Sequence, residues 1–364
     1  MTEQPQGTEA NPLVKTEKKK SYSLPTGVLG IGLSHSEDRI FAACMDGVYE
    51  LFPNDGTHRR LYEHQSYAAS VASLPDQTTL MSAGYDGVLQ WYDTNRQSVF
   101  RRIQAHRFWS WQMVLSPNGK YAASSTGQYL AGGEKYEPRA EKEPSVKLFD
   151  VKNGQLCQQW SHTPPVQSVA FSPDSRYVAA GNLMGEVRVW DVESGNLLAN
   201  WTTDAFTSWG IIKSHCYIGG IYALAFSPDS QHLLLAGMGP MRDPMAGNGR
   251  QLWQRFSWQE STPKLVDQTH DGQSGEGLME TLAIHPAGKL FIMGGRLRGG
   301  KWNAALFSLQ DGNRLDSLNT GYRMTGACFN QAGNSLFTCG SDKQPKPKNG
   351  KWKPFGVVDI YDLV

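Results

Sequence analysis

The sequence of 364 residues is poor in the features that mark secreted and membrane-spanning proteins. It has five cysteines, an odd number without paired spacing, which argues against a disulfide framework and favours free thiols in a reducing compartment. No apolar run approaches the length of a membrane span, and the first twenty residues lack the apolar segment of a secretory signal. We therefore expect a cytoplasmic protein that has no membrane partner.

The sequence also has no excess of one charge and no recognisable catalytic motif. Lys plus Arg (35) and Asp plus Glu (34) leave a formal net charge of +1, so overall charge does not direct the chain to nucleic acid. The nine histidines form no metal-binding pattern, and a Gly-x-Ser-x-Gly motif, a phosphate loop and a dinucleotide fingerprint are all missing. We therefore predict no catalytic residue, no metal site and no cofactor.

What the sequence does contain is a well-formed unit of four short β-strands at residues 166–201. Ser-Pro-Asp-Ser at 172–175 and Glu-Ser-Gly-Asn at 193–196 supply turn chemistry, and residues 186–190 alternate charged residues with Val at the period of a strand. Four antiparallel strands in so few residues cannot bury both faces of their sheet. The unit therefore needs similar neighbours.

The same pattern recurs seven times along the chain. The residue just before the first turn of each unit forms one column: Leu33, Ser73, Leu115, Phe171, Phe226, Ile284 and Phe329. A second column, near the end of the third strand, is aromatic in all seven units: Phe52, Tyr92, Phe149, Trp190, Phe256, Phe307 and Tyr361. A period of roughly forty to forty-five residues with four strands per unit is typical of a propeller blade.

From about residue 28 onward the sequence resembles the WD-repeat family, and Trp190-Asp191 retains the dipeptide that names it. The resemblance implies an all-β, seven-bladed β-propeller of four-stranded antiparallel blades over residues 20–364. It also implies structural roles for the WD dipeptide, for Trp109 and for histidines nine residues before three of the first-strand positions. These histidines are His64, His106 and His162. The glycine that the family places before each histidine is absent here.

The two ends of the chain predict how the ring closes. Residues 1–19 are polar and without periodicity, so we expect a disordered tail. The last repeat ends at residues 361–364 and has no room for a fourth strand, which would leave an open sheet edge prone to aggregation. We expect Lys20–Leu24 to supply that strand and close the last blade, as is common in the family.

Insertions between second and third strands and between blades predict one face with long loops, which is where recognition is usual. In the sixth and seventh repeats these loops combine Lys and Arg with Trp. The predicted partner-binding patch, which we call the basic rim, consists of Arg296, Arg298, Lys301, Trp302, Lys346, Lys348, Lys351, Trp352 and Trp209. The alternative is that these loops are merely solvated.

The expected function is a non-catalytic protein-interaction scaffold, acting as a monomer or within a larger complex, with a partner that the basic rim predicts to be acidic. Two alternatives stay open. One is a binder of nucleic acid or another phosphate-rich ligand through the Lys, Arg and Trp loops of repeats six and seven, which salt-dependent binding would favour. The other is an enzyme with a site at the central mouth, which an ordered ligand at the axis would favour.

Overall fold

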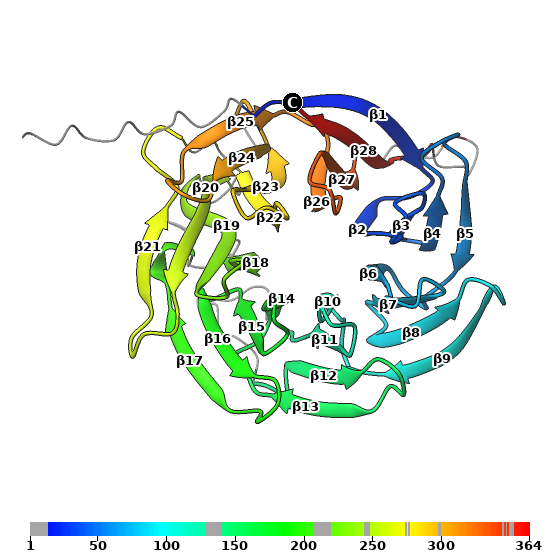
Figure 1. Ribbon diagram of the computed structural model, residues 1–364, viewed down its shortest axis with the longest axis horizontal. Coiled ribbons are helices and arrows are strands. Elements are labelled where there is room, and N and C mark those ends of the chain that lie inside the picture. Colours follow the sequence, from blue (N-terminus) through cyan, green and yellow to red (C-terminus); the bar gives the residue numbers. More distant parts are fainter. Residues whose placement is uncertain are drawn as a thin grey trace, which may run out of the picture.

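The structure is a computed structural model that describes residues 14–128, 140–206, 220–243, 248–273, 275, 277–297, 300–343, 346, 348 and 353–364. Seven four-stranded antiparallel sheets stand around a central axis, each with its first strand innermost, so the chain is a seven-bladed β-propeller (Figure 1). In the described part of the chain the helical element is one short 3-10 turn, Asp204–Phe206. No helix found there is long and apolar enough to cross a membrane.

Within each blade the strands follow the sequence from the inside to the outside, except that the N-terminal strand is the outermost strand of blade seven. Blades one to three contain β2 (Val28–Leu33), β3 (Ile40–Cys44), β4 (Gly47–Leu51), β5 (His58–Tyr62), β6 (Ala68–Ser73), β7 (Thr79–Gly84), β8 (Val88–Asp93), β9 (Ser98–Gln104), β10 (Gln112–Leu115), β11 (Tyr121–Ser125), β12 (Val146–Asp150) and β13 (Leu156–Trp160). Blades four and five contain β14 (Val166–Phe171), β15 (Tyr177–Asn182), β16 (Glu186–Asp191), β17 (Leu197–Thr202), β18 (Gly220–Phe226), β19 (His232–Asp243), β20 (Asn248–Ser257) and β21 (Lys264–Gln268). Blades six and seven contain β22 (Gly277–Ile284), β23 (Leu290–Leu297), β24 (Ala304–Ser308), β25 (Arg314–Leu318), β26 (Arg323–Phe329), β27 (Ser335–Ser341), β28 (Gly356–Leu363) and β1 (Thr16–Leu24).

The two repeat columns of the sequence coincide with the strands. Every residue of the first column is the last residue of an innermost strand, from Leu33 in β2 to Phe329 in β26. Six of the seven aromatic residues of the second column lie in a third strand, and Phe52 follows β4 directly. The core therefore forms between blades, where the aromatic column packs against the neighbouring sheet. Trp190, for example, is buried in a cluster that reaches from blade three to blade four.

The N-terminal strand closes the ring as the sequence predicts, but it is longer than expected. β1 pairs antiparallel with β28 and completes the last blade (Figure 1). It begins at Thr16, four residues before Lys20, because its start is held by its own contacts: the Thr16 backbone and hydroxyl donate to Asp316 Oδ2 at 2.9 and 2.6 Å, and Lys18 Nζ lies 2.6 Å from Asp359 Oδ2. Residues 14–19 of the predicted tail are thus ordered, with Lys15 hydrogen-bonded to Val364, and residues 1–13 lie outside the described residues.

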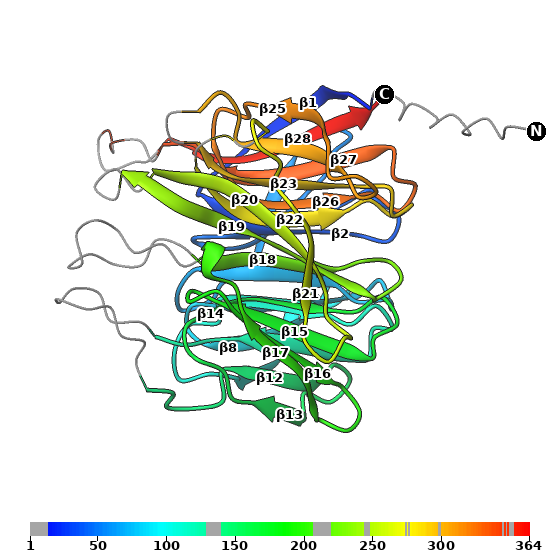
Figure 2. The ribbon, with the colours of Figure 1, turned by 90° about the vertical axis from the view of Figure 1, so that its left-hand side faces the viewer.

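One of the predicted insertions extends a blade. Between Met238 and Gly249 the ladder of β19 and β20 continues with the pairs Met241–Gly249 and Asp243–Asn248. The resulting ribbon reaches beyond the neighbouring strands on one side of the ring (Figure 2). We call this side the long-loop face; it carries the connections between second and third strands and those between successive blades.

Candidate functional site

The best-defined surface of the long-loop face is built on residues 105–111, which connect β9 to β10. Backbone hydrogen bonds hold this connection to the turn of blade two: the amides of Ala105 and His106 donate to the Gly87 carbonyl at 3.0 Å, and that of Ser110 donates to Gly84 at 3.2 Å. Gly87 has φ +72°, and a Cβ there would lie 2.3 Å from the His106 carbonyl oxygen. Only glycine permits this close approach, so the connection is fixed in place.

A second set of hydrogen bonds holds the connection to blade three. The Trp111 indole N–H donates to the Gly127 carbonyl at 2.9 Å, and the Thr126 hydroxyl donates to the Trp109 carbonyl at 2.7 Å. The Arg107 amide donates to Glu143 Oε1 at 2.6 Å. Backbone hydrogen bonds and the Trp111 indole therefore tie residues 105–111 to two blades.

These constraints bring aromatic rings from two blades into one cluster, which we call the aromatic stack: Tyr85, Phe108, Trp109 and Trp111. Trp109 lies between Tyr85 (ring centroids 4.7 Å, planes at 5°) and Phe108 (4.9 Å, 12°). Trp111 stands edge-on to Trp109 at 5.3 Å and 75°. Tyr67, 45% exposed, lies 5.8 Å from Tyr85 at the border of the stack. Trp109 remains 39% exposed, and since both its faces are covered, the exposed part is its edge.

On one side the aromatic stack reaches the central channel, a cavity of 610 Å³ that the innermost strands surround and that Tyr85 and Trp111 help to line. Arg323 and Glu280 form a bidentate ion pair in its wall, with nitrogen–oxygen distances of 2.6 and 2.5 Å. Burial acts to lower the pKa of Arg323, but the hydrogen bond to Glu280, the Glu280 charge and the nearby Tyr85 and Tyr222 raise it above its ordinary value. The Arg323 guanidinium therefore stays charged and is paired with the Glu280 carboxylate.

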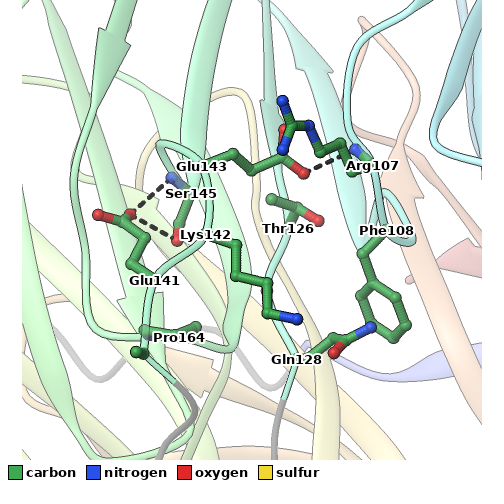
Figure 3. A pocket seen from close by; sticks show the side chains of 11 residues that line it. Arg107, Phe108, Thr126, Gln128, Glu141, Lys142, Glu143, Ser145 and Pro164 are labelled. Carbon is green, nitrogen blue, oxygen red and sulfur yellow. Dashed lines mark hydrogen bonds between the residues drawn. The ribbon is translucent and has the colours of Figure 1, made fainter.

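On the other side the Phe108 ring lines a pocket of 320 Å³ at blade three and its connections to blades two and four, which we call the Phe108 pocket (Figure 3). Its lining is Arg107, Phe108, Thr126, Gly127, Gln128, Ala140, Glu141, Lys142, Glu143, Ser145 and Pro164. The volume falls at the lower end of the range of about 300–1,000 Å³ that is usual for ligand sites. The pocket is thus large enough for a side chain of a partner.

The three histidines of the family resemblance are buried, and the rings of His64 and His106 are hydrogen-bonded to polar side chains of the blades. His64 contacts Ser82 Oγ at 2.8 Å and both oxygens of Asp86 at 3.1 Å. Burial acts to raise the pKa of Asp86, but the hydrogen bond and the charge of His64 bring it below its ordinary value. His106 Nε2 lies 2.9 Å from Ser124 Oγ, and His162 packs edge-on to Trp190. His64 therefore joins a serine and an aspartate of blade two, whereas the hydrogen bond of the His106 ring is to a serine of blade three.

His106 predicts a loss of stability in acid. Burial, with the Lys147 charge, lowers its pKa to about 3, against 6.5 for an exposed histidine. The folded protein thus favours the neutral form of His106. The contribution of this residue to the free energy of unfolding is therefore complete above pH 6.5 and declines as the pH falls toward 3. At pH 5 this one residue should cost about 2 kcal/mol of unfolding free energy relative to pH 7. Urea unfolding of the protein and of a His106→Gln variant at both pH values measures this loss. The variant should lose less unfolding free energy between pH 7 and pH 5. An equal loss in both proteins would contradict a neutral, buried His106.

The structure places the other predicted structural residues as follows. Trp190 is 3% exposed and stacks on Trp160 at 5.2 Å and 16°. Asp191 accepts hydrogen bonds from the Ser194 amide and hydroxyl at 2.8 and 2.9 Å, and these bonds lower the pKa of its carboxyl. The predicted role of Trp109 is incomplete. Its ring packs against its neighbours, but its edge belongs to the surface.

The basic rim is only partly within the described residues. Lys301, Lys346 and Lys348 are exposed, and Arg296 is half-buried at the end of β23. The prediction that Trp302 contacts a partner is wrong. Trp302 is 7% exposed and packs with Trp253 and Phe307 in the core between blades five and six. The Arg314 guanidinium lies over its ring at 5.4 Å. A side chain buried in this way cannot anchor a partner. The remaining members lie outside the described residues: Arg298, Lys351, Trp352 and Trp209.

The aromatic stack was missed as a site because its members come from two repeats. The available signal was the run Arg107-Phe108-Trp109-Ser110-Trp111, which places three aromatic residues in a connection between blades. The position in the repeat assigned only Trp109, and to a structural role. For metals, the described ranges hold no group of three or more His, Cys, Asp or Glu side chains that could bind an ion.

Comparison with known proteins agrees with the fold. The family model for the WD domain, G-beta repeat, matches residues 154–191, which run from the turn after β12 through β16. The chain is 28% identical over 168 residues to the meiotic recombination protein rec14 of Schizosaccharomyces pombe, across 44% of the chain and 50% of the relative. It is 25% identical over 161 residues to eukaryotic translation initiation factor 3 subunit I of Lodderomyces elongisporus, across 43% and 41%.

A third relative, telomerase protein component 1 of Rattus norvegicus, is 24% identical over 242 residues, across 65% of the chain and 7% of the relative. The chain thus matches half or less of the length of each of these relatives. What the three have in common with it is the repeat, and the structure arranges seven such repeats as blades around one axis. The chain is thus similar to the WD-repeat family in its matched repeat at residues 154–191 and in its ring of seven four-stranded blades.

Proposed function

We propose that this protein is a non-catalytic scaffold that binds protein partners through its long-loop face, with the aromatic stack as the centre of contact. One observation carries the proposal: aromatic rings from two blades gather, partly exposed, between the central channel and the Phe108 pocket. Aromatic residues are enriched at the energetic centres of interfaces, because they bury a large apolar area. One of the similar proteins is by its name a subunit, of translation initiation factor 3.

The rigidity of residues 105–111 supports the same function. A side chain that is already ordered loses little conformational entropy on binding, and this raises affinity. The hydrogen bonds to Gly84, Gly87 and Gly127 hold the rings in the free protein. A surface of this kind suits a partner that docks without large rearrangement.

A scaffold is also favoured over an enzyme by the polar groups at the channel. Arg323 and Glu280 are bound to each other on two pairs of atoms, which leaves neither poised as a general acid or base. His106, next to the aromatic stack, is kept neutral by burial and bound to Ser124. These groups are engaged in holding the ring together.

We further propose a reducing compartment such as the cytoplasm. Cys44, Cys157, Cys328 and Cys339, the cysteines among the described residues, are all free thiols. Burial raises the pKa of Cys328 and Cys339 to about 12, so both stay protonated and unreactive at neutral pH. Subcellular fractionation checks this proposal, and recovery of the protein only from an oxidising compartment would contradict it.

The function is tested by comparing what the protein and two of its variants capture. Trp109→Ala should reduce the binding of any partner that centres on the aromatic stack by at least about tenfold, since interface anchors contribute about 2 kcal/mol or more. The matched control is Phe100→Ala, which removes another exposed aromatic ring of blade two, 49% exposed on the outer strand β9. Quantitative mass spectrometry of captured proteins should show partners lost with Trp109→Ala and kept with Phe100→Ala. If both variants capture the same set as the unaltered protein, the aromatic stack is not the binding surface.

A further inference from the structure

The Phe108 pocket has an apolar floor beside the aromatic stack and a cationic rim. The Phe108 ring, Gly127, Ala140 and Pro164 supply apolar surface. One face of Phe108 is covered by Trp109 in the aromatic stack, and the ring also points into the pocket beside Gln128 (Figure 3). The pocket and the exposed edge of Trp109 are therefore parts of one continuous surface.

The acidic residues of the pocket are engaged in holding the loop. Glu141 Oε1 accepts hydrogen bonds from the Ser145 amide and hydroxyl, both at 2.8 Å, and from the His162 amide at 2.9 Å. Glu143 accepts from the Arg107 amide at 2.6 Å and pairs with Lys147 Nζ at 2.7 Å. Both carboxylates are thus satisfied by the protein itself and form the frame of the pocket.

The cationic side chains that line the pocket, unlike its carboxylates, are not engaged by the described part of the protein. Arg107 and Lys142 are both exposed, and their charged ends form no ion pair within the described residues. Lys142 extends across the pocket toward Gln128 (Figure 3). The two cations of the lining equal its two carboxylates in number, but both carboxylates already have protein partners, Glu143 among them through Lys147. A charged ligand that complements this rim must be an anion.

From this arrangement we infer that the Phe108 pocket binds an acidic side chain of a partner peptide, whose carboxylate meets Arg107 and Lys142 while a neighbouring apolar residue packs on the edge of Trp109. The inference rests on the proposed function, because it assigns the chemistry of the partner at the same face. A guanidinium group binds a carboxylate through two parallel hydrogen bonds, and an ammonium group adds a second positive charge. The apolar floor would receive the methylene part of a Glu or Asp side chain.

A peptide is favoured over a single-stranded nucleic acid by charge and by ring geometry. Nucleic-acid sites follow the backbone with several Lys and Arg residues and present free ring faces to stacked bases. Here two cations and two carboxylates line the pocket, and both faces of Trp109 are already covered. Such a surface complements one or two negative charges beside an apolar group.

The test is a selection from a phage library of random dodecapeptides on the full-length protein. We expect the selected peptides to be enriched in Asp or Glu next to an apolar residue. The charge-removed variant Arg107→Gln/Lys142→Gln should bind a synthetic copy of the leading peptide at least about tenfold more weakly and with a flatter dependence on salt. The matched control, Arg96→Gln/Lys152→Gln, removes one exposed arginine and one exposed lysine from turns between third and fourth strands, on the opposite face, and should bind as the unaltered protein does.

The other outcomes separate this inference from the proposed function. Selected peptides that lack acidic residues but lose binding with Trp109→Ala would overturn the inference and leave the function standing. Equal binding by the charge-removed variant, or no selected peptide at all, would also overturn it. Tighter binding after Glu is replaced by phosphoserine would reassign the pocket to phosphate, and displacement of the peptide by oligo-dT would reassign it to nucleic acid. A failure of the function itself would appear in the capture experiment as identical partner sets.

Discussion

Deletion of residues 1–24 is expected to destabilise the whole ring, whereas deletion of residues 1–13 is expected to leave its melting temperature within about 2 °C of the full chain. The longer deletion removes β1, which pairs with β28 at eight positions. It exposes the backbone edge of β28 and the core around Leu24, which is fully buried. It also leaves the buried Asp359 carboxylate without Lys18.

The size of this effect follows from the groups that lose their partners. Burial of one leucine contributes about 1.5–3 kcal/mol, and each backbone hydrogen bond that is lost with β1 contributes about 0.5–1.5 kcal/mol. The loss of at least about 5 kcal/mol should lower the melting temperature by about 10 °C or more, or prevent folding. Differential scanning calorimetry of the two truncated proteins measures the difference. Equal melting temperatures would show that β1 is not what closes the ring.

Replacement of Trp190 by Ala is expected to lower the free energy of unfolding by about 3–5 kcal/mol, the usual cost of truncating a buried aromatic residue. The indole is 3% exposed, stacks on Trp160 and lies beside His162 at 6.1 Å, so its removal leaves a void between blades three and four. Trp190→Phe keeps a ring at the position and should lose less. Urea unfolding monitored by circular dichroism measures both variants.

The same variants decide between a structural and a binding role for this position. A structural Trp190 predicts that partner capture by the folded Trp190→Ala protein is unchanged at low temperature. Stability like that of the unaltered protein, combined with lost capture, would make the position part of the binding surface.

The blade architecture could be predicted from the sequence because it repeats. The residue before the first turn of each unit, such as Leu33 or Phe329, ends an innermost strand, and the aromatic column marks the third strand. The requirement to cover the β28 edge likewise located the closing strand. Its start at Thr16 could not be foreseen, because it depends on Asp316, a residue three hundred positions away.

The surface was harder to predict because exposure depends on neighbouring blades. Gly-Lys-Trp at 300–302 reads as a loop, yet Trp302 is enclosed by Trp253 and Phe307. In contrast, Trp109 occupies a structural position of the repeat, but its ring stacks on Tyr85 of the preceding turn and remains 39% exposed. Both outcomes come from contacts between units, which a pattern within one unit does not contain.

The most direct measurement of the central claim is hydrogen–deuterium exchange of the protein with and without a captured partner. If the aromatic stack is the centre of contact, partner binding should slow exchange in residues 105–111 and in the neighbouring segment 140–145. The outer strands β9, β13 and β17 should exchange at unchanged rates. Slowed exchange in those outer strands, with residues 105–111 unaffected, would contradict the account.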